Sequence, residues 1–159
     1  MEQRANDPPE GKVAIYWKTM EKGNLRMPPT PFFLEVLKYY RVGFSQLHPF
    51  AVQKVVIFEM WFRSLNLEPS VKVFRACFRM TVSGVGWYTF AKQNNFVGRQ
   101  ESVLHDWRGS FFFIDQTVIP ADAVETLLWQ KDRPKDVSHM PTLSTSEQRL
   151  LDADRKSVV

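Results

Sequence analysis

The sequence contains one cysteine, Cys77, among 159 residues. A single thiol excludes a disulfide framework within the chain and a zinc site built from several thiolates. This composition is typical of a protein from a reducing intracellular compartment. Because no dense basic cluster signals nuclear import, the sequence leaves nucleus and cytoplasm open as locations.

Long apolar runs are also missing. The most apolar window, residues 55–62, is interrupted by Glu59 and is far shorter than the roughly 20 residues of a membrane span. Residues 1–10 are polar and lack the apolar centre of a signal peptide. We therefore expect neither a membrane partner nor secretion by that route.

Aromatic residues are abundant, with 13 Phe, 5 Trp and 4 Tyr. This content excludes a disordered or low-complexity chain and provides enough apolar surface for a core. The length fits one domain. Lys and Arg total 21 against 17 Asp and Glu, which gives a formal net charge of +4.

The chain divides into three parts by composition. Residues 1–11 are polar and contain proline, which indicates a flexible lead-in. Residues 12–130 carry the apolar pattern of a folded domain. Residues 131–159 form a charged, Ser/Thr-containing tail, in which we expect one helical turn at 147–154 and leave the order of the remainder open.

Apolar spacing predicts four helices, at 13–21, 31–40, 48–65 and 70–80. The second has a strong start signal in Thr30 followed by Pro31, and Gly43 is its expected end. The apolar residues of the third spread around the helical wheel, so we expect it to be buried on nearly all sides. These residues are Val52, Val55, Val56, Ile57, Phe58, Met60, Trp61 and Phe62.

Two strands are predicted after residue 80, at 87–92 and 111–115, where aromatic and β-branched residues follow turn signals. We expect them to pair with each other in antiparallel fashion. The predicted fold class is α+β, with a mainly helical N-terminal two-thirds and a short antiparallel β element after residue 80.

No cofactor, metal or small-molecule site is indicated by the sequence. The three histidines and Cys77 lie in separate segments without ligand spacing, and Cys77 is expected to be a buried small apolar residue. The segment 83–87 is a turn that lacks the lysine and third glycine of a phosphate-binding loop. We therefore predict no cofactor and no catalytic constellation.

The positive charge is concentrated in residues 30–80, which hold seven Lys and Arg against three Glu. Lys72, Arg75 and Arg79 are spaced so that one helix would place them on one face, a geometry that can follow a phosphate backbone. They are the candidate nucleic-acid-binding residues, although a solvated helix face or an acidic protein partner explains them as well. Trp87 and its aromatic neighbours could stack on bases if one face of a small sheet were open.

An enzyme is the alternative. A metal-dependent nucleic-acid-processing site would have to draw its carboxylates from Glu59, Asp106 and Asp115. Glu59 lies between apolar residues and must find a partner if buried, with a nearby arginine as the simplest candidate. Two-metal chemistry needs at least two of these carboxylates in one accessible cleft.

The order of motifs resembles the plant gypsy-type transposon domain over about residues 10–130. The resemblance rests on Gly11–Tyr16, Leu25–Pro28, Pro31–Val42, Ser45–Leu47, Lys54–Val55, Phe58–Glu59, Arg63–Leu65, Glu68–Val71, Phe74–Arg75, Gly86–Phe90 and Trp107 before Phe111–Asp115. It implies an origin in open reading frames of LTR retrotransposons, of which this chain would be a fragment, and it implies no catalytic residues. The leading hypothesis is a non-catalytic module with a gag-like, assembly or nucleic-acid-interacting role, whose partners are nucleic acid or a second copy. A transposase-like enzyme and a decayed element fragment are the alternatives.

Overall fold

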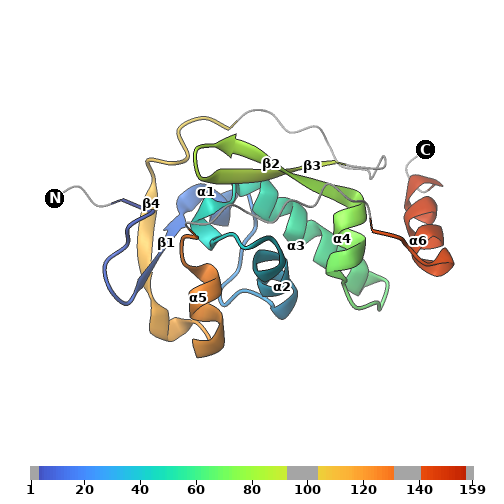
Figure 1. Ribbon diagram of the computed structural model, residues 1–159, viewed down its shortest axis with the longest axis horizontal. Coiled ribbons are helices and arrows are strands. Elements are labelled where there is room, and N and C mark those ends of the chain that lie inside the picture. Colours follow the sequence, from blue (N-terminus) through green and yellow to red (C-terminus); the bar gives the residue numbers. More distant parts are fainter. Residues whose placement is uncertain (1–3, 93–103, 131–140, 157–159) are drawn as a thin grey trace.

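The computed structural model of the chain describes residues 4–92, 104–130 and 141–156. Helices pack in the centre, one small sheet lies at one end, and a second sheet runs along one edge (Figure 1). The elements are β1 (Lys12–Tyr16), α1 (Trp17–Glu21), α2 (Pro31–Tyr40), α3 (Pro49–Ser64), α4 (Val71–Cys77), β2 (Phe78–Gly84), β3 (Trp87–Lys92), β4 (Phe111–Asp115), α5 (Val124–Leu127) and α6 (Thr145–Lys156), with 3-10 turns at Phe44–Gln46, Gln116–Val118 and Ala121–Ala123. The α+β class is confirmed.

The strands are placed differently from the prediction. Residues 13–21 do not form one helix, because β1 occupies the first part and α1 only the second. The four residues 13–16 are all buried, so they show a continuous apolar run rather than an alternation. The β structure is therefore distributed along the chain and is not confined to the part after residue 80.

The predicted pairing of 87–92 with 111–115 is wrong. Both segments are strands, but β4 pairs with β1, and β3 pairs with β2. The β1–β4 pair joins segments about a hundred residues apart and includes an ion pair between Lys12 and Asp115, at 3.1 Å. Figure 1 shows this pair at one end of the molecule and the β2–β3 hairpin along the upper edge.

The start of α2 is confirmed. The hydroxyl of Thr30 accepts a hydrogen bond from the backbone N–H of Phe33, and Pro31 occupies the first helical position. The helix spans Pro31–Tyr40 as predicted, but the residue that terminates it is Arg41 and not Gly43. Arg41 adopts a left-handed conformation with φ 55°, and its N–H closes onto the carbonyl of Leu37.

The central helix α3 has the predicted bounds to within a residue, and His48 caps it through a hydrogen bond from Phe50 N–H to Nδ1. It is not buried on all sides. The side chain of Ile57 is 51% exposed and that of Met60 is 59% exposed. One side of α3 is therefore an apolar surface open to solvent.

The fourth predicted helix, 70–80, is too long by three residues at its C-terminal end. Ser70 caps α4 as a helix start, but the helix ends at Cys77 and the chain continues directly into β2. The reason is that Phe78 and Met80 turn inward at strand spacing, so pairing with β3 replaces the last helical turn. Cys77 is buried, as predicted.

Aromatic rings from four elements form the centre of the core. Phe58 of α3 lies 5.6 Å from the ring centre of Phe32 and 5.3 Å from that of Phe74. Phe74 in turn contacts Phe90 of β3 edge-on at 5.0 Å. This cluster fixes α2, α3 and α4 against the inner face of the β2–β3 hairpin.

Gln46 connects the core to the turn of this hairpin. Its side chain is 2% exposed, accepts hydrogen bonds from the N–H groups of Gly43 and Gln130, and donates to the carbonyls of Gly86 and Gln130. Gly86 has φ 77°, and a Cβ there would lie 2.6 Å from a ring carbon of Trp129. The turn therefore requires glycine, and Gln46 holds it in place.

The two outer segments contact the fold as well. Ala5, within the predicted lead-in, is buried in a cluster with Ala14, Tyr16 and Trp107. In the C-terminal part, the turn expected at 147–154 is a helix of 12 residues, α6, which lies beside α4 (Figure 1). Among the described segments, no helix has the length and apolarity needed to cross a bilayer.

Candidate functional site

The predicted basic face does not exist as one helix face. Lys72 and Arg75 lie on α4, but Arg79 lies on β2, because the helix ends before it. The ammonium of Lys72 pairs with Glu147 of α6 at 2.9 Å, and this hydrogen bond is the main reason why the pKa of Glu147 is lowered. The guanidinium of Arg75 lies over the ring of Tyr39, 4.6 Å from its centre. Arg79 is exposed, and a role for the three residues in nucleic-acid binding stays a prediction.

The three candidate carboxylates occupy three different environments. Glu59 is 6% exposed and binds Arg63 at 2.9 Å and the hydroxyl of Thr30 at 2.6 Å, so the predicted pairing with an arginine is confirmed. Asp115 is on the surface beside Lys12, and the N–H of Thr117 together with that lysine lowers its pKa to about 2. Within residues 4–92, 104–130 and 141–156, no three His, Cys, Asp or Glu side chains gather as a metal site would require.

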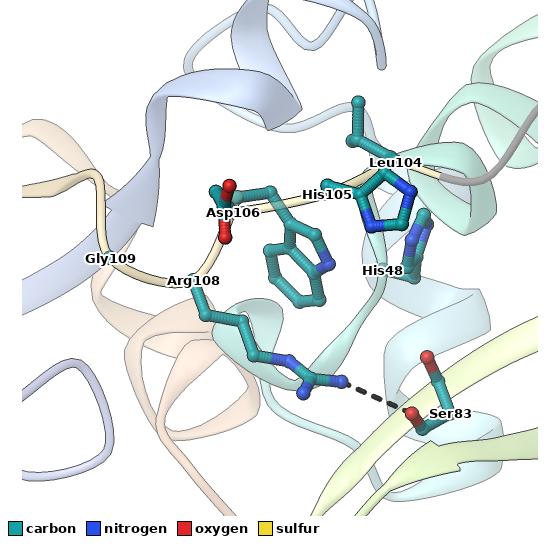
Figure 2. Close-up of a pocket in the computed structure, with 8 residues that line it drawn as sticks. His48, Ser83, Leu104, His105, Asp106, Arg108 and Gly109 are labelled. Atoms are coloured by element: carbon teal, nitrogen blue, oxygen red, sulfur yellow. Dashed lines mark hydrogen bonds between the residues drawn. The ribbon is translucent and has the colours of Figure 1, made fainter.

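Asp106 lines a pocket that the sequence did not predict, which we call the Arg108 pocket. It has a volume of about 450 Å³ and lies where the turn before β4 meets the end of β2 and the start of α3. Its lining residues, shown in Figure 2, are His48, Ser83, Leu104, His105, Asp106, Trp107, Arg108 and Gly109. The pocket therefore joins segments from three parts of the chain.

Arg108 is the main charged group at this pocket. Its guanidinium carbon lies 4.4 Å from the ring centre of Trp87 and 5.1 Å from that of Trp107, and one N–H donates to the carbonyl of Ser83 at 3.1 Å. Figure 2 shows the Arg108 side chain extending toward Ser83, while the carboxylate of Asp106 lies away from the guanidinium. Within the described part of the chain, Arg108 forms no ion pair, so its charge is available to an anion.

The aromatic base under Arg108 is held rigidly. Trp107 is 4% exposed and makes edge contacts with Tyr16 at 4.8 Å and with His48 at 5.1 Å. The indole N–H of Trp87 donates to the Tyr16 hydroxyl at 3.3 Å, and burial is the main cause that raises the pKa of Tyr16. Contact with fixed indole rings restricts the orientation of the guanidinium, and Arg108 remains exposed to solvent.

His48 forms another wall of the pocket and is neutral at pH 7. Partial burial is the main cause that lowers its pKa to about 4, and the charges of Arg108 and Lys54 lower it further. Its Nδ1 is already used as the acceptor that caps α3. His48 therefore serves the pocket as a neutral, fixed wall.

Comparison with known proteins finds one similarity, which covers the segment that forms the helical core. Residues 15–82 match the family described as "Putative gypsy type transposon". Over these residues the chain is similar to a gypsy-type transposon domain. No curated protein and no solved structure matches the chain.

The match to the gypsy-type transposon domain runs from β1 into β2 and covers less than half of the chain. It includes His48, but Trp87, Trp107 and Arg108 lie beyond its end. The resemblance seen in the sequence reaches further, to about residue 130, and includes both tryptophans. The similarity to the family thus rests on the helical core, and the Arg108 pocket is formed where later segments pack on that core.

The helical core also has an apolar groove, between the segment before α2 and the outer side of α3. Its volume is about 350 Å³. It is lined by Asn24, Leu25, Arg26, Pro29, Thr30, Phe33, Val56, Glu59, Met60 and Arg63. The buried carboxylate of Glu59 forms part of its wall, and its two partners Thr30 and Arg63 occupy the carboxylate oxygens.

Sequence reasoning found some of these features and missed others. It singled out Trp87 as a surface for base stacking and Glu59 as an acid in need of a partner. It missed Arg108, because a single arginine between Trp107 and Gly109 has no motif and its neighbours come from residues far away in the chain. Only the packing of β3 against the turn before β4 brings the guanidinium onto two indole rings.

Proposed function

We propose that this gypsy-type transposon domain is a non-enzymatic interaction module that binds nucleic acid. The observation that carries the proposal is the exposed guanidinium of Arg108, which lies on two tryptophan rings at the mouth of a pocket. A guanidinium can bind a phosphate through its N–H groups and can stack with its plane on a nucleobase. Both interactions are characteristic of proteins that bind polynucleotides.

The overall charge supports the same proposal. A formal net charge of +4 favours association with a polyanion through long-range attraction. The carboxylate nearest to the pocket, Asp106, forms no ion pair with Arg108. An origin in a plant LTR retrotransposon is consistent with this activity and is part of the proposal.

Arg108→Ala is expected to weaken binding of a fluorescein-labelled oligonucleotide about tenfold, because one charge-assisted contact and one stacking plane are lost. Fluorescence anisotropy at low salt measures the affinity. Arg108→Lys keeps the charge but not the plane, so an intermediate affinity is expected. Arg26→Ala removes one exposed arginine outside the pocket and is the matched control, with a loss of no more than about twofold from net charge alone.

The proposal fails if wild-type protein binds neither DNA nor RNA at low salt. It also fails if Arg26→Ala weakens binding as much as Arg108→Ala does, since binding would then follow net charge and not the pocket. Far-UV circular dichroism of each variant shows whether the fold is retained.

Self-association is a second candidate, favoured by the outer side of α3. Ile57 and Met60 lie one turn apart with half or more of their surface exposed, and Leu65 and Leu67, just beyond the end of the helix, are exposed as well. A second copy offers an equally apolar surface, so a two-fold pairing would bury both rows. We expect a concentration-dependent increase in mass by light scattering, which Met60→Glu abolishes and Val118→Glu, at another exposed apolar residue, does not. A wild-type chain that stays monomeric at all concentrations contradicts this candidate.

A further inference from the structure

We propose that a single strand of nucleic acid lies along the outer face of the β2–β3 hairpin, from Arg108 at one end to Arg79 at the other. The inference rests on the proposed function and names the form of nucleic acid and its path. The sequence predicted that nucleic acid would bind one face of a helix; the inference instead places it on the outer face of the two strands β2 and β3. Its basis is the alternation of side chains, the position of two arginines and the small residues between them.

The two faces of the hairpin differ in character. Phe78 and Phe90 are buried and Met80 packs against the core, which defines the inner face. Side chains alternate along a strand, and directly opposed residues share a face. The outer face holds the opposed pairs Arg79 with Ala91 and Thr81 with Thr89. The regular pairing is interrupted between Val82 and Gly84, and at this turn end Trp87 packs against Tyr16 and Trp129 and lies beneath Arg108.

The charge on this face is positive at both ends. Arg79 is exposed, and within the described residues no carboxylate forms an ion pair with it. Arg108 lies over Trp87 at the opposite end of the face and is also without an ion pair there. A chain of phosphates is the complementary partner for two such arginines in line, and the hydroxyls of Thr81 and Thr89 can donate hydrogen bonds between them.

The dimensions fit a short single strand. Five residue steps separate Arg79 from Gly84, which corresponds to about 16 Å of strand. One strand of a duplex carries a phosphate about every 3.4 Å along its axis, and an extended single strand has a longer spacing, so at most about five nucleotides span this length. Ala91 and the two threonines are small, so a backbone can approach the sheet closely.

The pocket end favours a single strand over a duplex. The exposed guanidinium of Arg108 can stack on a base only if that base is unpaired and accessible. A duplex offers arginine its phosphates and the edges of its bases in the grooves, but no free base face for stacking. Lys72 lies outside this path because it is on α4 and not on the hairpin. Its ammonium is paired with Glu147 of α6 at 2.9 Å.

The test uses the full chain and fluorescein-labelled oligothymidylates of 4, 8 and 16 nucleotides, an oligouridylate of 8 nucleotides and a 16-base-pair duplex. We expect the single strands of 8 and 16 nucleotides to bind more tightly than the duplex. Arg79→Ala is expected to weaken single-strand binding threefold to tenfold and to reduce the slope of log affinity against log salt by about 0.7, the value for one phosphate contact. Thr89→Val, which keeps shape and removes the hydroxyl, is expected to weaken binding about twofold.

Lys72→Ala is the control that distinguishes a path along the β2–β3 hairpin from a path along α4. If the strand follows the hairpin, Lys72→Ala leaves the affinity within about twofold of wild type. If Lys72→Ala weakens binding as much as Arg79→Ala does, the nucleic acid follows α4 and the inference is overturned. Two results would overturn the hairpin path while the proposed function stands. One is that Arg79→Ala binds with normal affinity while Arg108→Ala binds more weakly than wild type. The other is that the duplex binds more tightly than the single strands. Absence of binding to every probe removes both.

Discussion

Gln46→Leu is expected to lower the free energy of unfolding by roughly 4 kcal/mol. The side chain is buried and makes four hydrogen bonds, to the backbone of Gly43, Gly86 and Gln130. Leucine fills a similar volume, so the change removes polar partners and leaves little cavity. The N–H groups of Gly43 and Gln130 and the two carbonyls then lose their partner, and each stranded buried group costs about 1–3 kcal/mol before local rearrangement restores part of it.

Urea unfolding followed by tryptophan fluorescence measures this loss. Gln53→Leu is the matched control, because Gln53 is a half-buried residue of α3 with no hydrogen bond of its side chain to the described part of the chain. We expect that substitution to change the stability by no more than about 0.5 kcal/mol. A Gln46→Leu variant as stable as Gln53→Leu would show that the backbone of the 128–130 segment does not depend on Gln46.

Helix starts were predictable from the sequence because their signals are local. Thr30 before Pro31 and His48 before Pro49 cap α2 and α3 with side-chain atoms that lie two or three residues from their partners. Such signals need no knowledge of the rest of the fold. The same holds for Ser70 at the start of α4.

Strand pairing was not predictable because its causes are distant. The local sequence of residues 13–16 predicts part of a short apolar helix. These residues form a strand because they pair with Phe111–Asp115. The end of α4 is a similar case, since Phe78 and Met80 suit either a helix or a strand and the partner strand β3 decides. Local propensity is weak in such segments, and tertiary pairing overrides it.

The candidate site shows the same division. The sequence identified an abundance of basic and aromatic residues but placed the cations on a helix that ends too early. Arg79 lies on a strand because α4 ends at Cys77 and β2 begins at the next residue. Arg108 belongs to the site because its guanidinium contacts the ring of Trp87. Residue types were therefore predictable, whereas their arrangement depended on contacts between segments far apart in the chain.

The stability of the domain is expected to fall by about 1–2 kcal/mol between pH 7 and pH 5 because of His48. Its pKa is about 4 in the folded chain and near 6.5 when unfolded. Between these values the unfolded chain binds a proton that the folded chain does not, so acidification favours unfolding. The contribution is complete above pH 6.5 and is lost progressively as the pH falls toward 4.

The physical cause is the environment of the imidazole. Protonation would place a charge in a partly buried site beside Arg108 and Lys54 and would convert Nδ1, which accepts from Phe50 N–H, into a donor. His48→Asn is the control, since asparagine caps a helix well and does not titrate in this range. Urea unfolding of both proteins at pH 7, 6 and 5 is expected to show a steeper loss for wild type than for His48→Asn. Parallel losses in the two proteins would mean that another group causes the pH dependence.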